Sequence, residues 1–202
     1  MALNVREMLT GDVRRISTVY RYSSFLVHRR ENVAEHTFYC CLYAYLIALD
    51  LEDEDKYLCQ FNMETLFERA LLHDIDESLT GDFLRSIKHG DDDIRKGLKR
   101  VSKKMITKLE KSLGTSLQTP WENCKANDLE GDIISLADFL CVVAYLCEEF
   151  KSGNRHIVVV LHEVKAYLEK MNRGEGINNS LKLLSRYIKE SLDLLNEVLR
   201  ES

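Results

Sequence analysis

The sequence places a histidine and an aspartate side by side, His73 and Asp74, at the end of an apolar segment, and Glu77 follows one helical turn later. An imidazole and a carboxylate in this arrangement can bind one divalent metal ion together, and a nearby free carboxylate can transfer a proton. Two more residues of ligating type, His36 and Asp138, lie within apolar segments. A polar side chain without a partner would be costly there. One shared ion explains all four placements.

Each of these residues also has an ordinary structural explanation. A single buried histidine such as His36 is most often a satisfied core residue, and Asp138 would then pair with a buried cation. Glu77 and Asp82 would cap the turn at Thr80-Gly81. These explanations must all hold independently, whereas one metal ion accounts for the four ligands together, so the metal site is the favoured interpretation.

Two imidazoles and two carboxylates suit a borderline divalent ion such as zinc, cobalt, manganese or iron. A further position for water or a phosphate oxygen is easier to accommodate on cobalt, manganese or iron than on a closed tetrahedral zinc. Such an ion lowers the pKa of water strongly, which creates a nucleophile near neutral pH. Glu77 is then placed to accept a proton or to protonate a leaving oxygen.

The composition sets broad limits on function. A chain of 202 residues is long enough for one domain with a hydrophobic core, and a net charge of -5 disfavours a binder of duplex nucleic acid. No apolar run approaches the roughly 18 residues of a membrane span. The six cysteines include no C-x-x-C pair and are expected to be reduced thiols. We expect a soluble, intracellular protein.

The spacing of apolar residues predicts an all-α, single-domain helical bundle over residues 1–202. One proline and nine glycines suit long helices joined by short turns. Residues 20–30 are predicted to be irregular and residues 114–127 to be the most loop-like section. Asn32 and Glu35 predict a capping box at the start of a core helix that carries His36. The predicted helices span about residues 4–20, 32–50, 63–72, 91–112, 129–150, 154–172 and 179–200.

A helical histidine, then a His-Asp pair, then a later aspartate resembles the pattern of the HD-domain metal-dependent phosphohydrolases. Within that superfamily the sequence is similar to the bacterial 5'-deoxynucleotidases and to the related phage dATP triphosphohydrolases. The similarity covers about residues 10–165, and the C-terminal helix adds little to it. Its motifs are Arg21-Tyr22, the run from Glu31 to His36, His73-Asp74 with Glu77, the run from Leu79 to Asp82, Ala137-Asp138, Glu148-Glu149 and Gly153-Asn154.

Carried over by position, the resemblance implies that His36, His73, Asp74 and Asp138 bind the metal and that Glu77 is the catalytic acid or base. It implies a divalent cobalt, manganese, zinc or iron ion, with additional magnesium where the substrate is a triphosphate. These relatives are commonly homo-oligomers. The resemblance also implies a bacterial cytosol, or the host cytosol if the chain is encoded by a phage.

The resemblance further assigns the substrate contacts. Arg21 and Asp82 would contact the sugar and phosphate, with Asp82 a partner for the 3'-hydroxyl. Tyr22 stands where the relatives usually carry a tryptophan, whose ring packs on the sugar and excludes a 2'-hydroxyl, so we expect a preference for deoxyribose. Lys88 matches a basic position near the phosphates.

Two departures from the relatives concern phosphate recognition. Arg85-Ser86 replaces a Thr-Pro pair, and Ser135 stands where a lysine is expected three residues before Asp138. The number of phosphates on the substrate therefore stays open.

The resemblance implies metal-dependent hydrolysis of the 5'-phosphate ester of deoxynucleotides. The substrate would be a dNMP, giving deoxynucleoside and phosphate, or a dNTP, notably dATP, giving deoxynucleoside and triphosphate. One alternative is an HD phosphohydrolase acting on another phosphoester, such as a cyclic dinucleotide or ppGpp, against which Arg21-Tyr22 and the Thr80-Gly81 turn argue. Another is a non-catalytic, metal-bound nucleotide sensor, which the presence of Glu77 disfavours.

Overall fold

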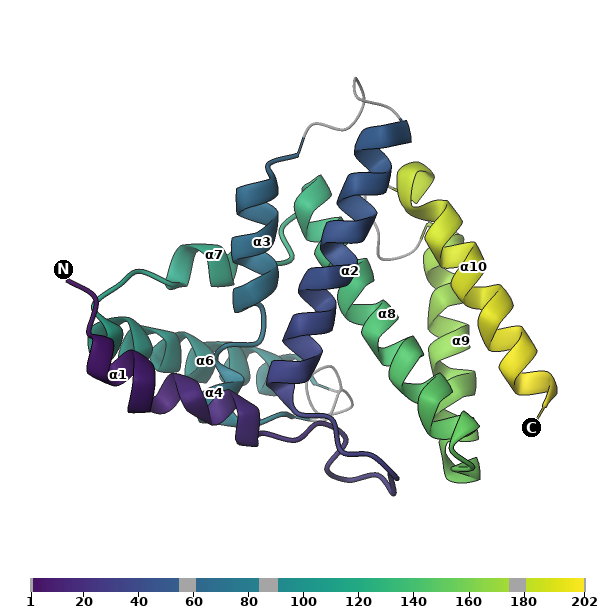
Figure 1. Ribbon diagram of the computed structural model, residues 1–202, viewed down its shortest axis with the longest axis horizontal. Helices are drawn as coiled ribbons and strands as arrows, with labels where there is room; N and C mark the ends of the chain where they lie inside the picture. Colours follow the sequence, from purple (N-terminus) through teal and green to yellow (C-terminus); the bar gives the residue numbers. More distant parts are fainter. Residues whose placement is uncertain (1, 55–60, 84–90, 175–180, 202) are drawn as a thin grey trace.

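The computed structural model describes residues 2–54, 61–83, 91–174 and 181–201, and within these ranges the chain is helical (Figure 1). An isolated antiparallel β-bridge pairs Tyr20 with Asn32. The predicted all-α class is confirmed. The elements are α1 (Val5–Thr10), the 3-10 helix η1 (Asp12–Thr18), α2 (Val33–Glu54), α3 (Met63–Leu72), α4 (Glu77–Thr80), α6 (Asp92–Leu113), α7 (Gln118–Glu122), α8 (Leu129–Lys151), the 3-10 helix η2 (Arg155–Ile157), α9 (Val158–Asn172) and α10 (Leu181–Arg200).

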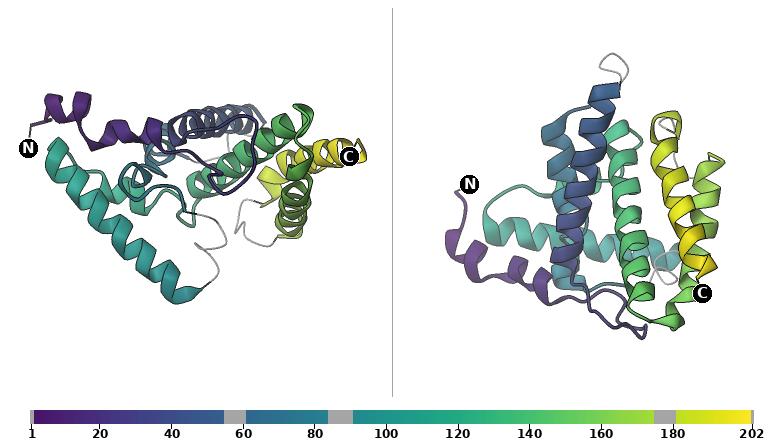
Figure 2. Two further views of the ribbon diagram at one scale, coloured as in Figure 1. Left: turned by 90° about the horizontal axis from the view of Figure 1, so that it is seen from below. Right: turned by 45° about the vertical axis from the view of Figure 1, so that its right-hand side comes forward.

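Helix α2 is the central element of the bundle, since it packs extensively on both α8 and α3. Figure 1 and the right-hand view of Figure 2 show α3 on one side of α2, with α8, α9 and α10 following on the other. Helices α1, η1, α4 and α6 contact one another and form the lower left part of Figure 1. The described part of the chain contains no helix long and apolar enough to cross a membrane.

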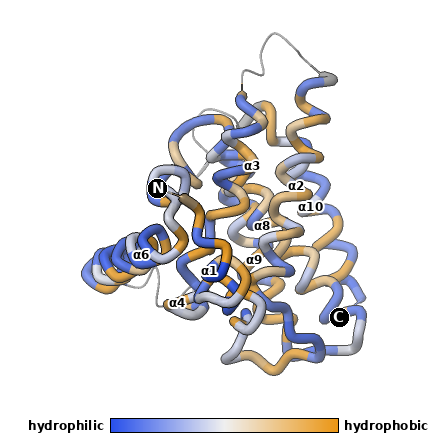
Figure 3. Tube along the Cα trace, turned by 60° about the vertical axis from the view of Figure 1, so that its left-hand side comes forward, coloured by the Kyte–Doolittle hydropathy of each residue, from blue (hydrophilic) through white to orange (hydrophobic). Residues whose placement is uncertain are grey.

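The buried apolar side chains fall into two clusters, and the hydropathy colouring in Figure 3 shows apolar segments on all the packed helices. The larger cluster joins α2, α3, α8, α9 and α10, and it includes Leu184, Ile188 and Leu195 of the C-terminal helix. Each such side chain contributes roughly 1.5–3 kcal/mol through burial. The apolar stripe of α10 therefore belongs largely to the core. The smaller cluster comprises Ile75, Ile106, Leu109, Leu113 and Trp121.

The start of α2 is determined by its first residues. Asn32 Oδ1 accepts a hydrogen bond from the Glu35 amide at 3.0 Å, and Glu35 Oε2 accepts one from the Asn32 amide at 3.1 Å. These reciprocal bonds satisfy two amides that the helix itself leaves unpaired. The predicted capping box is confirmed, and it sets His36 in the first turn of α2.

The predicted single helix over residues 4–20 is wrong. The chain is extended at Gly11, with φ -88° and ψ -168°, and this break separates α1 from η1. The Gly11 amide donates to the Glu7 carbonyl at 2.7 Å, which closes the last turn of α1.

The predicted loop over residues 114–127 is wrong in part, because it contains the short helix α7. Glu110 Oε1 accepts hydrogen bonds from the amides of Leu117 (2.7 Å) and Gln118 (2.8 Å), which satisfies donors at the helix start. Trp121 is buried in the smaller cluster and anchors the segment there. Residues 178–180, expected to cap the last helix, lie outside the described residues.

Glu149, near the end of α8, holds the segment that follows Arg21-Tyr22. Its side chain is 2% exposed, and its two oxygens accept hydrogen bonds from the amides of His28 and Arg29, both at 2.8 Å. Asn154 Nδ2 donates to Glu149 at 2.7 Å and to the Leu26 carbonyl at 2.8 Å. Burial alone would raise the pKa of Glu149, but these donors favour the carboxylate and lower the pKa.

We expect Glu149→Gln to lower the free energy of unfolding by about 1–3 kcal/mol, because an amide cannot accept from donors on both sides. Since the folded-state pKa lies below the unfolded value, this carboxylate stabilises the fold above the unfolded pKa of about 4.3. That contribution is lost as the pH falls through the folded-state pKa. Urea unfolding at neutral and acidic pH measures both effects.

Glu148→Gln is the matched control, since the neighbouring Glu148 side chain is 67% exposed and makes only a surface ion pair with Arg29 at 3.5 Å. It is expected to change the free energy of unfolding by less than about 0.5 kcal/mol. Equal losses in the two variants would contradict the role given to Glu149.

Candidate metal centre

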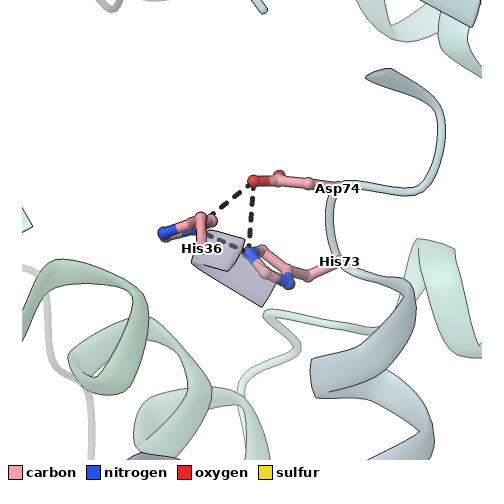
Figure 4. A group of neighbouring side chains, drawn as sticks. All are labelled: His36, His73 and Asp74. Atoms are coloured by element: carbon pink, nitrogen blue, oxygen red, sulfur yellow. Dashed lines mark hydrogen bonds and ion pairs between the residues drawn. The ribbon is translucent and has the colours of Figure 1, made fainter. Parts of the chain in front are cut away.

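Three packed helices bring the predicted metal ligands together. His36 lies in the first turn of α2 and is fully buried, His73 directly follows α3, and Asp138 lies in the middle of α8. Asp74 extends from the chain just after His73, and Figure 4 shows its carboxylate facing both imidazoles. Because α2 packs on both α3 and α8, side chains far apart in sequence meet at one point.

The donor atoms have the separations expected around a single ion. His36 Nε2 lies 3.2 Å from His73 Nε2 and 3.6 Å from Asp74 Oδ2, and the latter two atoms are 3.2 Å apart. Asp138 Oδ1 lies 3.0 Å from His36 Nε2. Ligands at about 2.0–2.2 Å from a common metal stand roughly 3.0–3.5 Å from each other. The donor atoms of His36, His73 and Asp74 therefore fit one divalent ion, and Asp138 adjoins this group through His36.

The orientation of His73 is set by the backbone of its own helix. Its Nδ1 donates to the Ala70 carbonyl at 2.7 Å, which places the proton on that nitrogen. The other nitrogen, Nε2, faces the cluster and is the nitrogen that a metal ion would bind. A backbone partner of this kind fixes both the tautomer and the ring orientation of a ligating histidine.

The charges of His36 and Asp74 match what a metal requires, whereas a metal ion at His73 would have to displace a proton. Burial, together with the positive charge of Arg21, lowers the pKa of His36 to about 4, so this imidazole is neutral at pH 7. Burial would also lower the pKa of His73, but the Asp74 carboxylate outweighs it and raises that pKa. Burial alone would raise the pKa of Asp74, whereas the adjacent His73 holds it well below the usual range. A neutral imidazole and an ionised carboxylate are the ligating forms.

A pocket of about 400 Å³ lies beside the ligands. Glu77, the predicted catalytic residue, is 4% exposed and lines the pocket together with His73 and Asp74. Gly81 ends α4 with φ +77°, a left-handed conformation that favours glycine and turns the chain towards Asp82. The pocket is lined by His73, Asp74, Asp76, Glu77, Thr80, Phe83, Arg95, Leu98, Lys99, Ser102, Trp121, Glu122, Cys124 and Lys125.

Arg21 lies near the cluster, since its charge acts on His36 and its own pKa is raised by Asp138 and Asp74 against the effect of burial. Its side chain is 14% exposed, and its Nε lies 3.7 Å from Glu31 Oε2. Its buried Nη1 has no hydrogen-bond partner within the described structure. A guanidinium that keeps an unused donor beside a metal cluster is suited to an anionic ligand.

Tyr22 adopts a backbone conformation that is rare for a tyrosine, with φ +57°. Its ring stacks on that of Tyr145, with centroids 4.4 Å apart and an interplanar angle of 1°. Burial and nearby carboxylates, among them Asp82, raise the pKa of the Tyr22 hydroxyl. The structure therefore brings Tyr22 and Asp82 into one neighbourhood with Arg21. Lys88 and the Arg85-Ser86 pair lie outside the described residues.

Sequence reasoning missed Lys125. This lysine, in the connection between α7 and α8, forms an ion pair with Asp138 Oδ2 and lines the pocket. A lysine in a loop 13 residues before its partner carries no periodic signal that would predict the contact. Trp121 Nε1 donates a hydrogen bond to Asp76 Oδ1 at 3.1 Å, next to Glu77 in the sequence.

An all-α bundle that brings a histidine, a His-Asp pair and a later aspartate together defines an HD-domain phosphohydrolase. The sequence profile of the family described as 5'-deoxynucleotidase YfbR-like matches residues 8–183. The chain therefore belongs to this family, and the predicted resemblance is confirmed.

Individual relatives agree with this assignment. The chain is 28% identical over 160 residues to a 5'-deoxynucleotidase of Erwinia tasmaniensis, which covers 77% of this chain and 78% of the relative. An HD-domain phosphohydrolase from Listeria innocua is 20% identical, with a TM-score of 0.67 and coverage of 98% and 99%. The cyanophage S-2L HD phosphohydrolase DatZ, bound to dA and one catalytic Zn²⁺ ion, is 14% identical, with a TM-score of 0.57 and coverage of 96% and 97%. The two structures share the fold.

We expect His36→Ala to weaken the binding of Mn²⁺ or Co²⁺ by at least about 100-fold, because even outer partners of metal ligands are worth 10–100-fold in affinity. Isothermal titration calorimetry of the metal-stripped protein measures this. His162→Ala is the control, since His162 is an exposed residue of α9. Unchanged affinity in His36→Ala would remove this residue from the ligand set.

Proposed function

We propose that the protein hydrolyses the 5'-phosphate ester of deoxynucleoside monophosphates, releasing deoxynucleoside and orthophosphate, in a reaction that depends on a divalent metal. Membership of the YfbR-like family and the relatives named 5'-deoxynucleotidase support the substrate class. One observation carries the proposal: the cluster of His36, His73 and Asp74, with Asp138 3.0 Å from His36, adjoins a pocket that also contains the nearly buried Glu77.

His36, His73, Asp74 and Asp138 would hold the ion, which is cobalt, manganese, zinc or iron. When bound, such an ion polarises a phosphoryl oxygen and lowers the pKa of water. Glu77 lies within the same pocket and handles the protons. Its carboxylate takes a proton from the attacking water and delivers it to the 5'-oxygen of the leaving deoxynucleoside.

The remaining residues position the substrate. Arg21 offers its unpaired guanidinium donor to a phosphoryl oxygen, since guanidinium stays charged and matches phosphate geometry. Tyr22, held rigidly by its stacking on Tyr145, forms a wall for the deoxyribose. Asp82 accepts a hydrogen bond from the 3'-hydroxyl, and Lys88 contacts the phosphates.

A second candidate substrate is a deoxynucleoside triphosphate, notably dATP, cleaved to deoxynucleoside and triphosphate with additional magnesium. The observation that favours it is the presence of Arg95 and Lys99 among the residues that line the pocket with Glu77, where their charges can neutralise a longer phosphate chain. The likeness to DatZ bound to dA adds support at the level of the fold.

We also propose that residues 1–202 act as one HD-type domain, in the cytoplasm, as a homo-oligomer. Phe38, Leu42, Leu46 and Leu49 are at least 36% exposed and follow one another along α2 at helical spacing. An exposed apolar stripe of this kind suits contact with a second copy. Duplex nucleic acid is not an expected partner.

The proposal is tested by incubating the protein with each dNMP, each dNTP and the matching ribonucleotides in Co²⁺, Mn²⁺, Zn²⁺ or Mg²⁺, with products separated by chromatography. We expect deoxynucleoside and orthophosphate from dNMPs. Deoxynucleoside and triphosphate from dNTPs would select the second candidate. No turnover of any of these substrates would contradict both and favour another phosphoester or a sensor.

We expect Glu77→Ala to lower turnover by about 10²–10⁴-fold while metal affinity is retained, because the residue transfers a proton without being a ligand. Glu68→Ala, at an exposed position of α3, is the control and should retain wild-type turnover. Near-normal activity of Glu77→Ala would show that the assigned role is wrong.

A further inference from the structure

Lys125 and His36 contact different oxygens of the Asp138 carboxylate. The Lys125 ammonium pairs with Oδ2, while Oδ1 of the same carboxylate lies 3.0 Å from His36 Nε2. A carboxylate with one oxygen held in this way can direct the other oxygen to a metal ion with a fixed geometry. Lys125 thus has the position of an outer partner of a metal ligand.

The location of Asp138 makes such a partner necessary. It lies on a helix whose neighbouring residues Ala137 and Phe139 are buried in the core, and its own side chain is only 23% exposed. Burial disfavours the charged form of a carboxylate, and the Lys125 ammonium is a cation paired with it. Helix α8 does not supply a positive charge one turn before Asp138, because the residue at that position is the uncharged Ser135.

The lysine reaches the cluster from outside the ligand-bearing helices. It belongs to the connection between α7 and α8, and its side chain is 42% exposed, on the wall of the pocket that contains His73 and Glu77. Because its stem does not fill the core, its charge can be removed with little effect on packing. The positioning role can therefore be separated from a structural one.

We propose that Lys125 is a positioning residue of the metal centre, which orients Asp138 by holding the carboxylate oxygen Oδ2 while Oδ1 lies beside His36. The role concerns the metal centre of the proposed function, and it extends that function by a residue from a loop. It also accounts for the uncharged Ser135, because the cation next to Asp138 is supplied by Lys125.

The test is the affinity of the metal-stripped full chain for Mn²⁺ or Co²⁺, measured by isothermal titration calorimetry. We expect Lys125→Met, which retains the length of the side chain and removes its charge, to weaken binding by about 10–100-fold. Lys108→Met is the matched control, since Lys108 makes a comparable lysine–aspartate pair with Asp12 at 2.7 Å, far from the metal ligands in sequence. It should leave metal affinity unchanged.

A second variant restores the charge from another position. Ser135 precedes Asp138 by three residues, so the two lie on the same face of α8. We expect Lys125→Met combined with Ser135→Lys to recover a substantial part of the lost affinity, which a mere packing defect would not allow. Unchanged affinity in Lys125→Met, or equal weakening in Lys108→Met, would overturn the proposal.

The affinity measurement also separates this proposal from the proposed function. A wild-type protein that binds metal but hydrolyses no deoxynucleotide would contradict the function. Weaker metal binding by Lys125→Met in that same protein would still support the positioning role. Normal turnover by the wild type together with unchanged metal affinity in Lys125→Met would contradict the positioning role alone.

Discussion

The gathering of two buried imidazoles and two partly buried carboxylates at the junction of α2, α3 and α8 is the constraint on which the rest of the structure depends. Polar groups removed from water destabilise a fold unless they have a partner. The donor atoms of His36, His73 and Asp74 lie within 4.8 Å of one another, and Asp138 lies 3.0 Å from His36. The ion that would link them would also join three helices that are far apart in sequence. The helix packing thus brings the ligands together, and a bound ion would in turn stabilise the helix packing.

Much of this arrangement was predictable from sequence, because strong local signals coincide with it. The capping box at Asn32 and Glu35 determines where α2 begins, and the apolar spacing around Asp138 identifies a core helix. The ligand types themselves then pointed to one ion. These signals depend on residues close together in the chain, so they can be recognised without knowledge of the tertiary structure.

The features that the sequence did not predict have a different origin. The break at Gly11 depends on an extended backbone within an otherwise helical pattern, and α7 starts where the distant side chain of Glu110 satisfies its first amides. Lys125 reaches Asp138 only because the connection before α8 folds back onto the site. The conformation of Tyr22 is likewise set by tertiary packing. The position of Lys125 and the conformation of Tyr22 depend on contacts between residues far apart in the chain, which no local pattern records.

The central claim is that four side chains share one divalent ion, and anomalous X-ray diffraction from crystals grown with Co²⁺ or Zn²⁺ tests it most directly. The account predicts one strong anomalous peak, about 2.0–2.2 Å from the Nε2 atoms of His36 and His73 and from one oxygen each of Asp74 and Asp138. A metal-loaded crystal with no peak among these four side chains, or with the ion bound elsewhere, would contradict it.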